Sequence, residues 1–148
     1  MKAEVYPVIL EPLVLGKPWG ARGKGPELVP GADANLKVGE VWLTADGDRQ
    51  SMVMNGPMAG MTLKDLRLKW GPDLLGQGPA GKKDEPFPLL LKFIHAAEHL
   101  SVQVHPDDPT AVRLEGSGPG KTEAWYILEA DAGARLVLGL KAGVDRTG

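Results

Sequence analysis

The sequence contains no cysteine among its 148 residues. This absence excludes disulfide-stapled scaffolds, thiolate zinc sites and cysteine nucleophiles. Long hydrophobic runs are also missing, because no stretch reaches the roughly 18 apolar residues that a membrane-spanning helix needs. The N-terminus lacks the apolar segment of a signal peptide. We therefore expect a cytoplasmic protein without a membrane partner.

An excess of charge of one sign is likewise missing, since 17 basic residues against 19 acidic residues give a net charge of −2. That balance disfavours a nucleic acid or an anionic membrane held by bulk charge. Glycine and proline are abundant, at 20 and 13 residues, and 43% of the chain is hydrophobic. This combination predicts many tight turns and short strands. The length predicts a single domain over residues 1–148.

The hydrophobic pattern predicts a mainly β protein with short strands. Apolar runs or strict alternation, bounded by turn residues, mark each of them. Short strands with frequent turns favour an antiparallel sandwich or barrel. The expected strands are residues 8–10, 13–15, 40–44, 51–54, 89–94, 100–105, 123–128 and 135–140.

Two short helices are predicted between these strands. Residues 62–70 place apolar side chains on one helical face, and Thr62 with Asp65 forms the pattern of a capping box. A second helix is expected to start with Asp108 as its cap, with proline at its first position, and to run to about Glu115.

Polar residues alternate along the strand predicted at residues 100–105. Side chains two and four positions apart share a strand face, so Ser101, Gln103 and His105 project together. Such a face is either a solvated surface or the lining of a pocket. An imidazole and an amide oxygen are both competent ligands for a borderline metal ion, which favours a pocket.

A carboxylate that could complete this set lies on a later strand. Lys121, Glu123 and Trp125 share one face by the same alternation. If the two strands are neighbours, Glu123 joins Gln103 and His105 as a metal ligand. Lys121 would then stand beside the metal, where it could bind a sugar oxygen or move a proton. The alternative is a cross-strand ion pair on an exposed face.

Three other motifs have ordinary explanations. His95 and His99 are four residues apart but lie in a strand-turn context, which predicts surface or turn histidines. Residues 116–122 resemble a phosphate-binding loop, but the first glycine is missing and a strand follows. Residues 76–81 match a dinucleotide-binding pattern in letters only, without the strand-to-helix context.

Two longer segments resemble the signature pair of type I mannose-6-phosphate isomerases. They are residues 100–108, with the sequence LSVQVHPDD, and residues 120–128, with the sequence GKTEAWYIL. The similarity is collinear over nearly the whole chain, which argues against coincidence. Further similar segments are residues 18–20, 40–42, 55–63 and 87–92.

This resemblance implies a mainly β fold, namely a cupin-type jelly-roll β-barrel with one or two short helices. It also implies one Zn²⁺ ion per chain and a small-molecule partner, mannose 6-phosphate, which is converted to fructose 6-phosphate through an enediol. The roles implied by motif are zinc ligation for Gln103, His105 and Glu123, catalysis for Lys121, and substrate binding for Ser101, Lys92, Glu40 and Trp19.

The chain departs from the family pattern in its length. In that family a second zinc-binding histidine lies on a later barrel strand, and an arginine and an acidic group also come later. Here His95 and His99 precede Gln103 and do not match the missing ligand. The resemblance therefore implies the N-terminal part of an isomerase-like chain, with a barrel that is incomplete at the C-terminus.

Two rival functions stay open. A non-catalytic cupin that binds a sugar or a sugar phosphate is favoured by the missing ligand. A cupin oxygenase ranks lower, because its iron needs two histidines and a carboxylate, and only one well-placed histidine is present. The sequence does not determine the oligomeric state.

Overall fold

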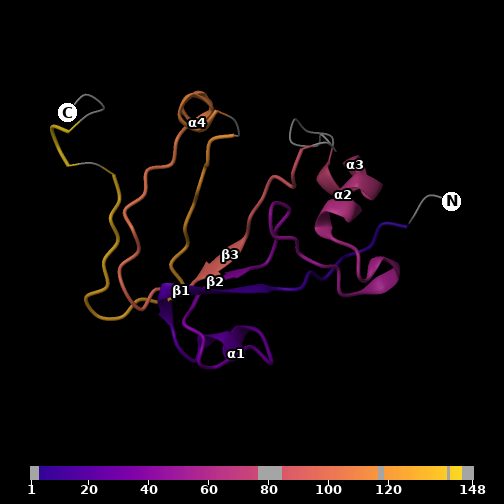
Figure 1. Cartoon of the computed structure of the whole chain (residues 1–148), viewed down its shortest axis with the longest axis horizontal. Helices are drawn as coiled ribbons and strands as arrows, with labels where there is room; N and C mark the ends of the chain where they lie inside the picture. The colour runs from indigo at the N-terminus through magenta and orange to yellow at the C-terminus, as the bar shows by residue number, and fades with distance from the viewer. Residues whose placement is uncertain (1–3, 77–84, 117–118, 140, 145–148) are drawn as a thin grey trace. The chain divides into compact units, whose positions relative to one another are not determined.

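The computed structural model describes residues 4–76, 85–116, 119–139 and 141–144 (Figure 1). The chain divides into two compact units, which are described separately. Unit 1 is Met1–Leu100 and unit 2 is Ser101–Gly148. Among the described residues, no helix is both long enough and apolar enough to cross a membrane.

Unit 1 is built on a three-stranded antiparallel sheet. The strands are β1 (Leu13–Ala21), β2 (Val38–Trp42) and β3 (Lys92–Ile94), in the order β1-β2-β3. The central strand β2 is buried along four of its five residues. Proline cannot donate a ladder hydrogen bond, and Pro18 is accommodated because β1 is an edge strand of this sheet. The predictions of strands at residues 13–15, 40–44 and 89–94 are thus confirmed, with shifted bounds.

Helix α2 (Leu63–Trp70) begins where the capping box predicts. The backbone N–H of Asp65 donates to Thr62 Oγ1 at 3.0 Å, and the backbone N–H of Thr62 donates to Asp65 Oδ2 at 3.2 Å. These two bonds satisfy amide groups that have no partner within the helix. The hydroxyl of Thr62 also donates to Asp65 Oδ2 at 2.7 Å, and this bond, together with that from Thr62 N–H, lowers the pKa of the Asp65 carboxyl below its ordinary value.

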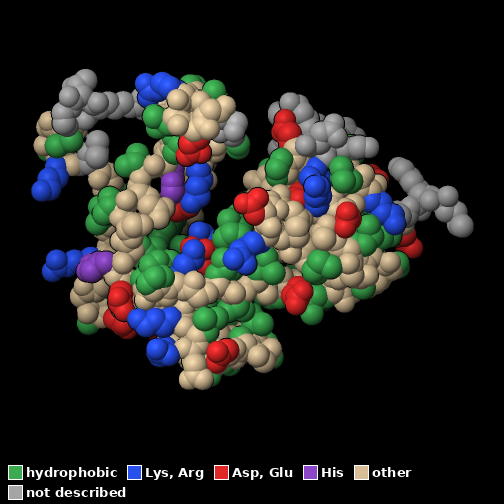
Figure 2. Space-filling model, in the orientation of Figure 1, with side chains coloured by type: hydrophobic (Ala, Val, Ile, Leu, Met, Phe, Trp, Pro, Cys, Tyr) green, Lys and Arg blue, Asp and Glu red, His purple; other side chains and the backbone are tan. Residues whose placement is uncertain are grey.

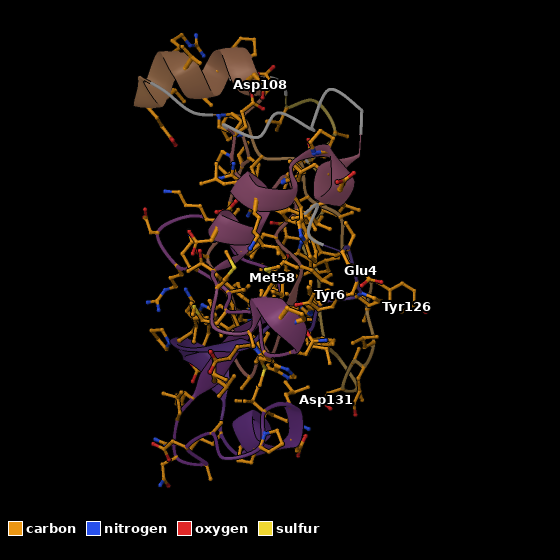
Figure 3. All side chains as sticks on the ribbon, turned by 90° about the vertical axis from the view of Figure 1, so that its right-hand side faces the viewer. Glu4, Tyr6, Met58, Asp108, Tyr126 and Asp131 are labelled. Carbon is orange, nitrogen blue, oxygen red and sulfur yellow. The ribbon has the colours of Figure 1, made fainter. Side chains whose placement is uncertain are left out.

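The core of unit 1 forms where α2 packs onto the segment before it. Leu66 is completely buried, and the ring of Trp70 meets the ring of Tyr6 edge-on, with centroids 5.5 Å apart. The hydroxyl of Tyr6 accepts from the backbone N–H of Met58 at 2.9 Å, and both residues are labelled in Figure 3. The buried members of this core are Val53, Met58, Leu66 and Trp70.

Three short helices in unit 1 were not expected from the sequence. They are α1 (Lys24–Leu28), the 3-10 helix η1 (Gly56–Met58) and α3 (Pro72–Leu75). Each spans five residues or fewer, too short for a periodic apolar face to stand out. The strands predicted at residues 8–10 and 51–54 form only isolated bridges, of which one pairs Leu10 with Val53.

A buried ion pair joins α2 to the turn after β2. Arg67 Nε donates to Asp46 Oδ2 at 2.6 Å, and both side chains are almost completely buried. The same carboxylate oxygen accepts from the backbone N–H of Phe87 at 2.8 Å. The carboxylate of Asp46 therefore holds both α2 and the segment that leads to β3.

Unit 2 contains the predicted second helix, α4 (Asp108–Glu115). Its cap is Asp107, not Asp108, because Asp107 has the extended backbone of a cap and its Oδ1 accepts from Thr110 N at 3.0 Å. Asp108, labelled in Figure 3, instead accepts from the backbone N–H of Gly120 through Oδ1 at 2.7 Å.

The strands predicted at residues 100–105, 123–128 and 135–140 are not formed. Their described residues, which exclude residue 140, lie in no hydrogen-bonded strand. Apolar side chains therefore remain on the surface of unit 2 (Figure 2), with Val104 86% exposed and Leu138 90% exposed. Alternation defines two faces, but a strand also needs a partner backbone. The described residues thus show an antiparallel sheet and a few helices.

Candidate functional site

The two motif segments of unit 2 lie side by side at the base of α4, which connects them (Figure 1). The backbone N–H of Lys121 donates to Pro106 O at 3.1 Å. Residue 120 is a glycine for a steric reason, because a Cβ atom there would lie 2.5 Å from Pro106 O. This close approach places the side chains that follow Gly120 opposite His105.

Three polar side chains from these segments form one cluster. His105 Nε2 lies 3.5 Å from Glu123 Oε2. Lys121 Nζ lies 2.5 Å from the same carboxylate oxygen and 3.4 Å from His105 Nε2. The sequence predicted that these residues would meet across neighbouring strands. They do meet, but the short connection that α4 makes between their segments brings them together, and not a β-ladder.

The Glu123 carboxylate is held by two donors. Lys121 binds Oε2, and Trp125 Nε1 donates to Oε1 at 2.5 Å. These hydrogen bonds, with that of Lys121 the stronger, lower the pKa of Glu123 to about 2. Glu123 is therefore ionised at neutral pH. The contact of Trp125 was not predicted, although its position two residues after Glu123 on one strand face was the available signal.

The two remaining polar residues of the predicted strand face also contact each other. Gln103 Nε2 donates to Ser101 Oγ at 3.0 Å, which leaves the amide oxygen of Gln103 as an acceptor. Gln103, His105 and Lys121 line a cavity of about 400 Å³ beside α4. Unit 2 thus offers an imidazole nitrogen and an amide at one cavity, with the Glu123 carboxylate in contact with His105.

This donor set fits a divalent cation such as zinc. In a tetrahedral site with bonds of about 2.0–2.2 Å, neighbouring ligand atoms lie about 3.4 Å apart. The 3.5 Å between His105 Nε2 and Glu123 Oε2 matches that separation. The amide oxygen of Gln103 is the third donor in reach of the cavity. The part of the chain that the structure describes has no group of three or more His, Cys, Asp and Glu residues.

A second polar cluster lies on the sheet of unit 1 and centres on Glu40, which is 8% exposed. Glu40 Oε2 accepts from Trp42 Nε1 at 2.7 Å, and Glu40 Oε1 accepts from Lys92 Nζ at 3.4 Å. Trp42 and Lys92 are register partners across β2 and β3, so they face the same side as Glu40. Strand pairing therefore brings together residues 52 positions apart.

Lys17 reaches this cluster from β1, and Trp19 of the same strand lies beside Gly39. Lys17 Nζ lies 4.0 Å from Glu40 Oε2. A Cβ atom on Gly39 would lie 2.4 Å from Lys17 Cβ and 2.9 Å from Trp19 Cζ3. Residue 39 must therefore be a glycine for both side chains to pack against β2 at this point. Lys17 was not predicted as a site residue. Its position two residues before Trp19 in a strand was the available signal.

All but one of the predicted site residues form two clusters, one in each unit. The unit 1 cluster contains Glu40 and Lys92, and the unit 2 cluster contains Ser101, Gln103, His105, Lys121 and Glu123. Trp19 lies beside Gly39, and no hydrogen bond among the described residues joins it to Glu40 or Lys92.

The described residues of the three motifs with ordinary explanations contain no helix. His95 and His99 lie in no helix, His99 is exposed, and partial burial lowers the pKa of His95. No helix follows residues 119–122, as expected for a strand-like context. Residues 117–118 and 77–81 lie outside the described residues.

Comparison with known proteins gives a consistent match. Residues 10–124 match the family described as phosphomannose isomerase type I, catalytic domain. The chain is 42% identical over 135 residues to a Bacillus subtilis protein named "probable mannose-6-phosphate isomerase", a match that covers 90% of this chain and 41% of that protein. It is 37% identical over 138 residues to mannose-6-phosphate isomerase of Streptococcus mutans, covering 92% and 41%.

A solved structure shows the same relationship. The crystal structure of mannose 6-phosphate isomerase from Bacillus subtilis aligns with a TM-score of 0.61 and 31% sequence identity, over 77% of this chain and 35% of that one. The chain thus spans about 40% of the length of the curated relatives named above.

Proposed function

Because the chain belongs to the type I phosphomannose isomerase family, we propose that the protein interconverts mannose 6-phosphate and fructose 6-phosphate. The observation that carries this proposal is the cluster of His105, Lys121 and Glu123, of which His105 and Lys121 line the cavity and all three lie within the residues matched by the family. We also propose that the fold is a single cupin-type barrel, to which the sheet of unit 1 contributes strands.

The reaction moves a proton between two neighbouring carbons of the sugar. A base removes the proton from C2 of the aldose, and the C1 carbonyl oxygen is protonated to give an enediol. A proton is then returned to C1 while the C2 hydroxyl loses its proton, which gives the ketose. The protein must therefore supply a group that moves a proton and must stabilise negative charge on the two sugar oxygens. Lys121 borders the cavity and would bind a sugar oxygen or move a proton at Nζ.

Gln103, His105 and Glu123 are the residues that would hold a zinc ion. When bound, zinc would act as a Lewis acid toward the sugar oxygens. Metal ligation requires an ionised carboxylate, and Glu123, whose pKa is lowered to about 2, is ionised at neutral pH. Ser101 orients the amide of Gln103, and its own hydroxyl hydrogen is available to a sugar oxygen.

The unit 1 cluster is proposed to bind substrate. Glu40 holds the ammonium of Lys92, which is 18% exposed, and the ring of Trp19 lies beside Gly39 of the same strand. A largely buried ammonium and an aromatic ring suit a hydroxylated, anionic sugar phosphate.

A coupled assay of mannose 6-phosphate isomerisation, together with zinc analysis of the same preparation, tests the proposal. Glu123→Gln keeps the shape of the side chain but removes the charge, so we expect metal content to fall and turnover to drop about 100-fold or more. Glu129→Gln changes the same net charge at an exposed position and is expected to leave both unchanged.

Two results would contradict the proposal in different ways. Full turnover in Glu123→Gln would exclude the unit 2 cluster as the metal site. Binding of mannose 6-phosphate without turnover, in a zinc-loaded protein, would favour the alternative of a non-catalytic sugar-phosphate-binding cupin. The coupled assay and a binding titration run side by side separate these outcomes.

A further inference from the structure

We propose that the ammonium of Lys121 occupies the cation position between His105 and Glu123 when no metal is bound, so that metal binding displaces it. The inference rests on the metal site of the proposed function. It adds a second role for Lys121, as a built-in counter-ion that competes with the metal.

The geometry of the cluster supports this role. Lys121 Nζ lies 2.5 Å from Glu123 Oε2 and 3.4 Å from His105 Nε2, and these are two of the atoms that would ligate the metal. The two acceptor atoms are 3.5 Å apart, so one compact cation contacts both. A lysine ammonium has three N–H donors and a single positive charge, which suits both acceptors.

The side chain of Lys121 also has room to leave. It is 46% exposed and borders the cavity of about 400 Å³ beside α4. Its four-carbon stem is flexible, so the ammonium can turn toward the cavity without a change in the backbone. Metal binding would thus move the ammonium toward the space where a sugar would bind.

The charges predict the direction of the effect on metal affinity. With Glu123 ionised, the ammonium neutralises the carboxylate that would attract a divalent cation. An ammonium that stays nearby after metal binding repels the ion. Lys121 should therefore weaken metal binding, although it would also serve the reaction.

Isothermal titration of the 148-residue chain with Zn²⁺ tests this inference. Lys121→Met removes the charge at nearly constant length, and we expect it to bind Zn²⁺ about tenfold or more tightly than the wild type. Lys121→Arg retains the charge, and Lys141→Met removes an exposed lysine of the same unit. Both should stay within about threefold of the wild-type affinity.

A second measurement follows the ammonium of Lys121 directly. In protein labelled with ¹⁵N-lysine, one side-chain ammonium resonance should shift when Zn²⁺ is added, and the spectrum of Lys121→Met identifies it. If that resonance stays unchanged while Zn²⁺ binds, the inference is wrong.

The outcomes separate this inference from the proposed function. An unchanged or weaker affinity in Lys121→Met, with binding abolished in Glu123→Gln, overturns the counter-ion role and leaves the metal site standing. Absence of Zn²⁺ binding in both the wild type and Lys121→Met overturns the counter-ion role and the metal site together.

Discussion

The two units of this chain differ in whether their apolar residues are buried. In unit 1 the side chains of Val38 and Leu66 are completely buried between paired strands and helices. In unit 2 Tyr126, labelled in Figure 3, is 87% exposed, and its neighbours along the chain are also exposed. Both units carry apolar residues in patterns typical of secondary structure. An apolar pattern therefore makes a face suitable for burial, but burial itself requires a partner element.

The polar clusters differ in a related way. The cluster around Glu40 depends on three paired strands, because Lys17, Glu40 and Lys92 come from β1, β2 and β3. The cluster around Glu123 depends on one local connection, because His105 and Lys121 lie on either side of α4. A polar cluster can thus be assembled by long-range strand pairing or by a short helical connection between two nearby segments.

The largest expected effect on stability comes from truncating one leucine to alanine in each unit, a buried one in unit 1 and an exposed one in unit 2. Leu66→Ala in unit 1 should lower the free energy of unfolding by about 2–5 kcal/mol, because it leaves a cavity in a close-packed core. Leu138→Ala in unit 2 should change it by less than about 0.5 kcal/mol, because that side chain is 90% exposed. Urea unfolding measures both. Equal losses would mean that the apolar side chains of unit 2 are covered in solution.

A smaller effect is expected from adding a methyl group where the two segments of unit 2 approach. In Gly120→Ala the new Cβ would lie 2.5 Å from Pro106 O and push the segments apart. Zn²⁺ affinity should then fall about tenfold, because His105 and Glu123 lie on different segments.

The matched control for this variant is Gly47→Ala. No atom lies within 4 Å of the new Cβ there, so Zn²⁺ affinity should be unchanged. The same titration measures both variants. Wild-type affinity in Gly120→Ala would show that close contact between the two segments is not needed to assemble the cluster.

The smallest effect is expected at the cap of α2. Thr62→Ala removes the side-chain bond to Asp65 N and should lower the free energy of unfolding by about 1 kcal/mol. The exposed Thr122→Ala is the control and should be neutral. Without the Thr62 hydroxyl, the pKa of Asp65 should rise toward its ordinary value of 3.8, which NMR titration can follow.

The pH dependence of the Thr62→Ala variant follows from the direction of that shift. A carboxyl whose pKa is lowered by folding stabilises the native state above its ordinary pKa, and loses this contribution as the pH falls through the native value. Thr62→Ala should therefore cost more stability at about pH 6 than at about pH 2. An equal loss at both values would show that the carboxylate of Asp65 is not stabilised by Thr62.

Much of the local structure was predictable from sequence. The capping box of Thr62 and Asp65 marks the start of α2, and the end of α4 falls at Glu115 as expected. The cap of α4, however, was predicted one residue too late, at Asp108 instead of Asp107. Helical hydrogen bonds join residues four positions apart, so the local sequence carries the needed information. The meeting of His105 with Glu123 was also predicted, from residue chemistry and alternation.

Tertiary structure alone decided which strands formed and what surrounds Glu40. Residues 100–105 and 123–128 alternate as strands do, yet neither is paired among the described residues. Lys17 and Lys92 join Glu40 only because β1 and β3 flank β2. Strand hydrogen bonds join residues far apart in the chain, so alternation determines which face is apolar but not which backbone will cover it.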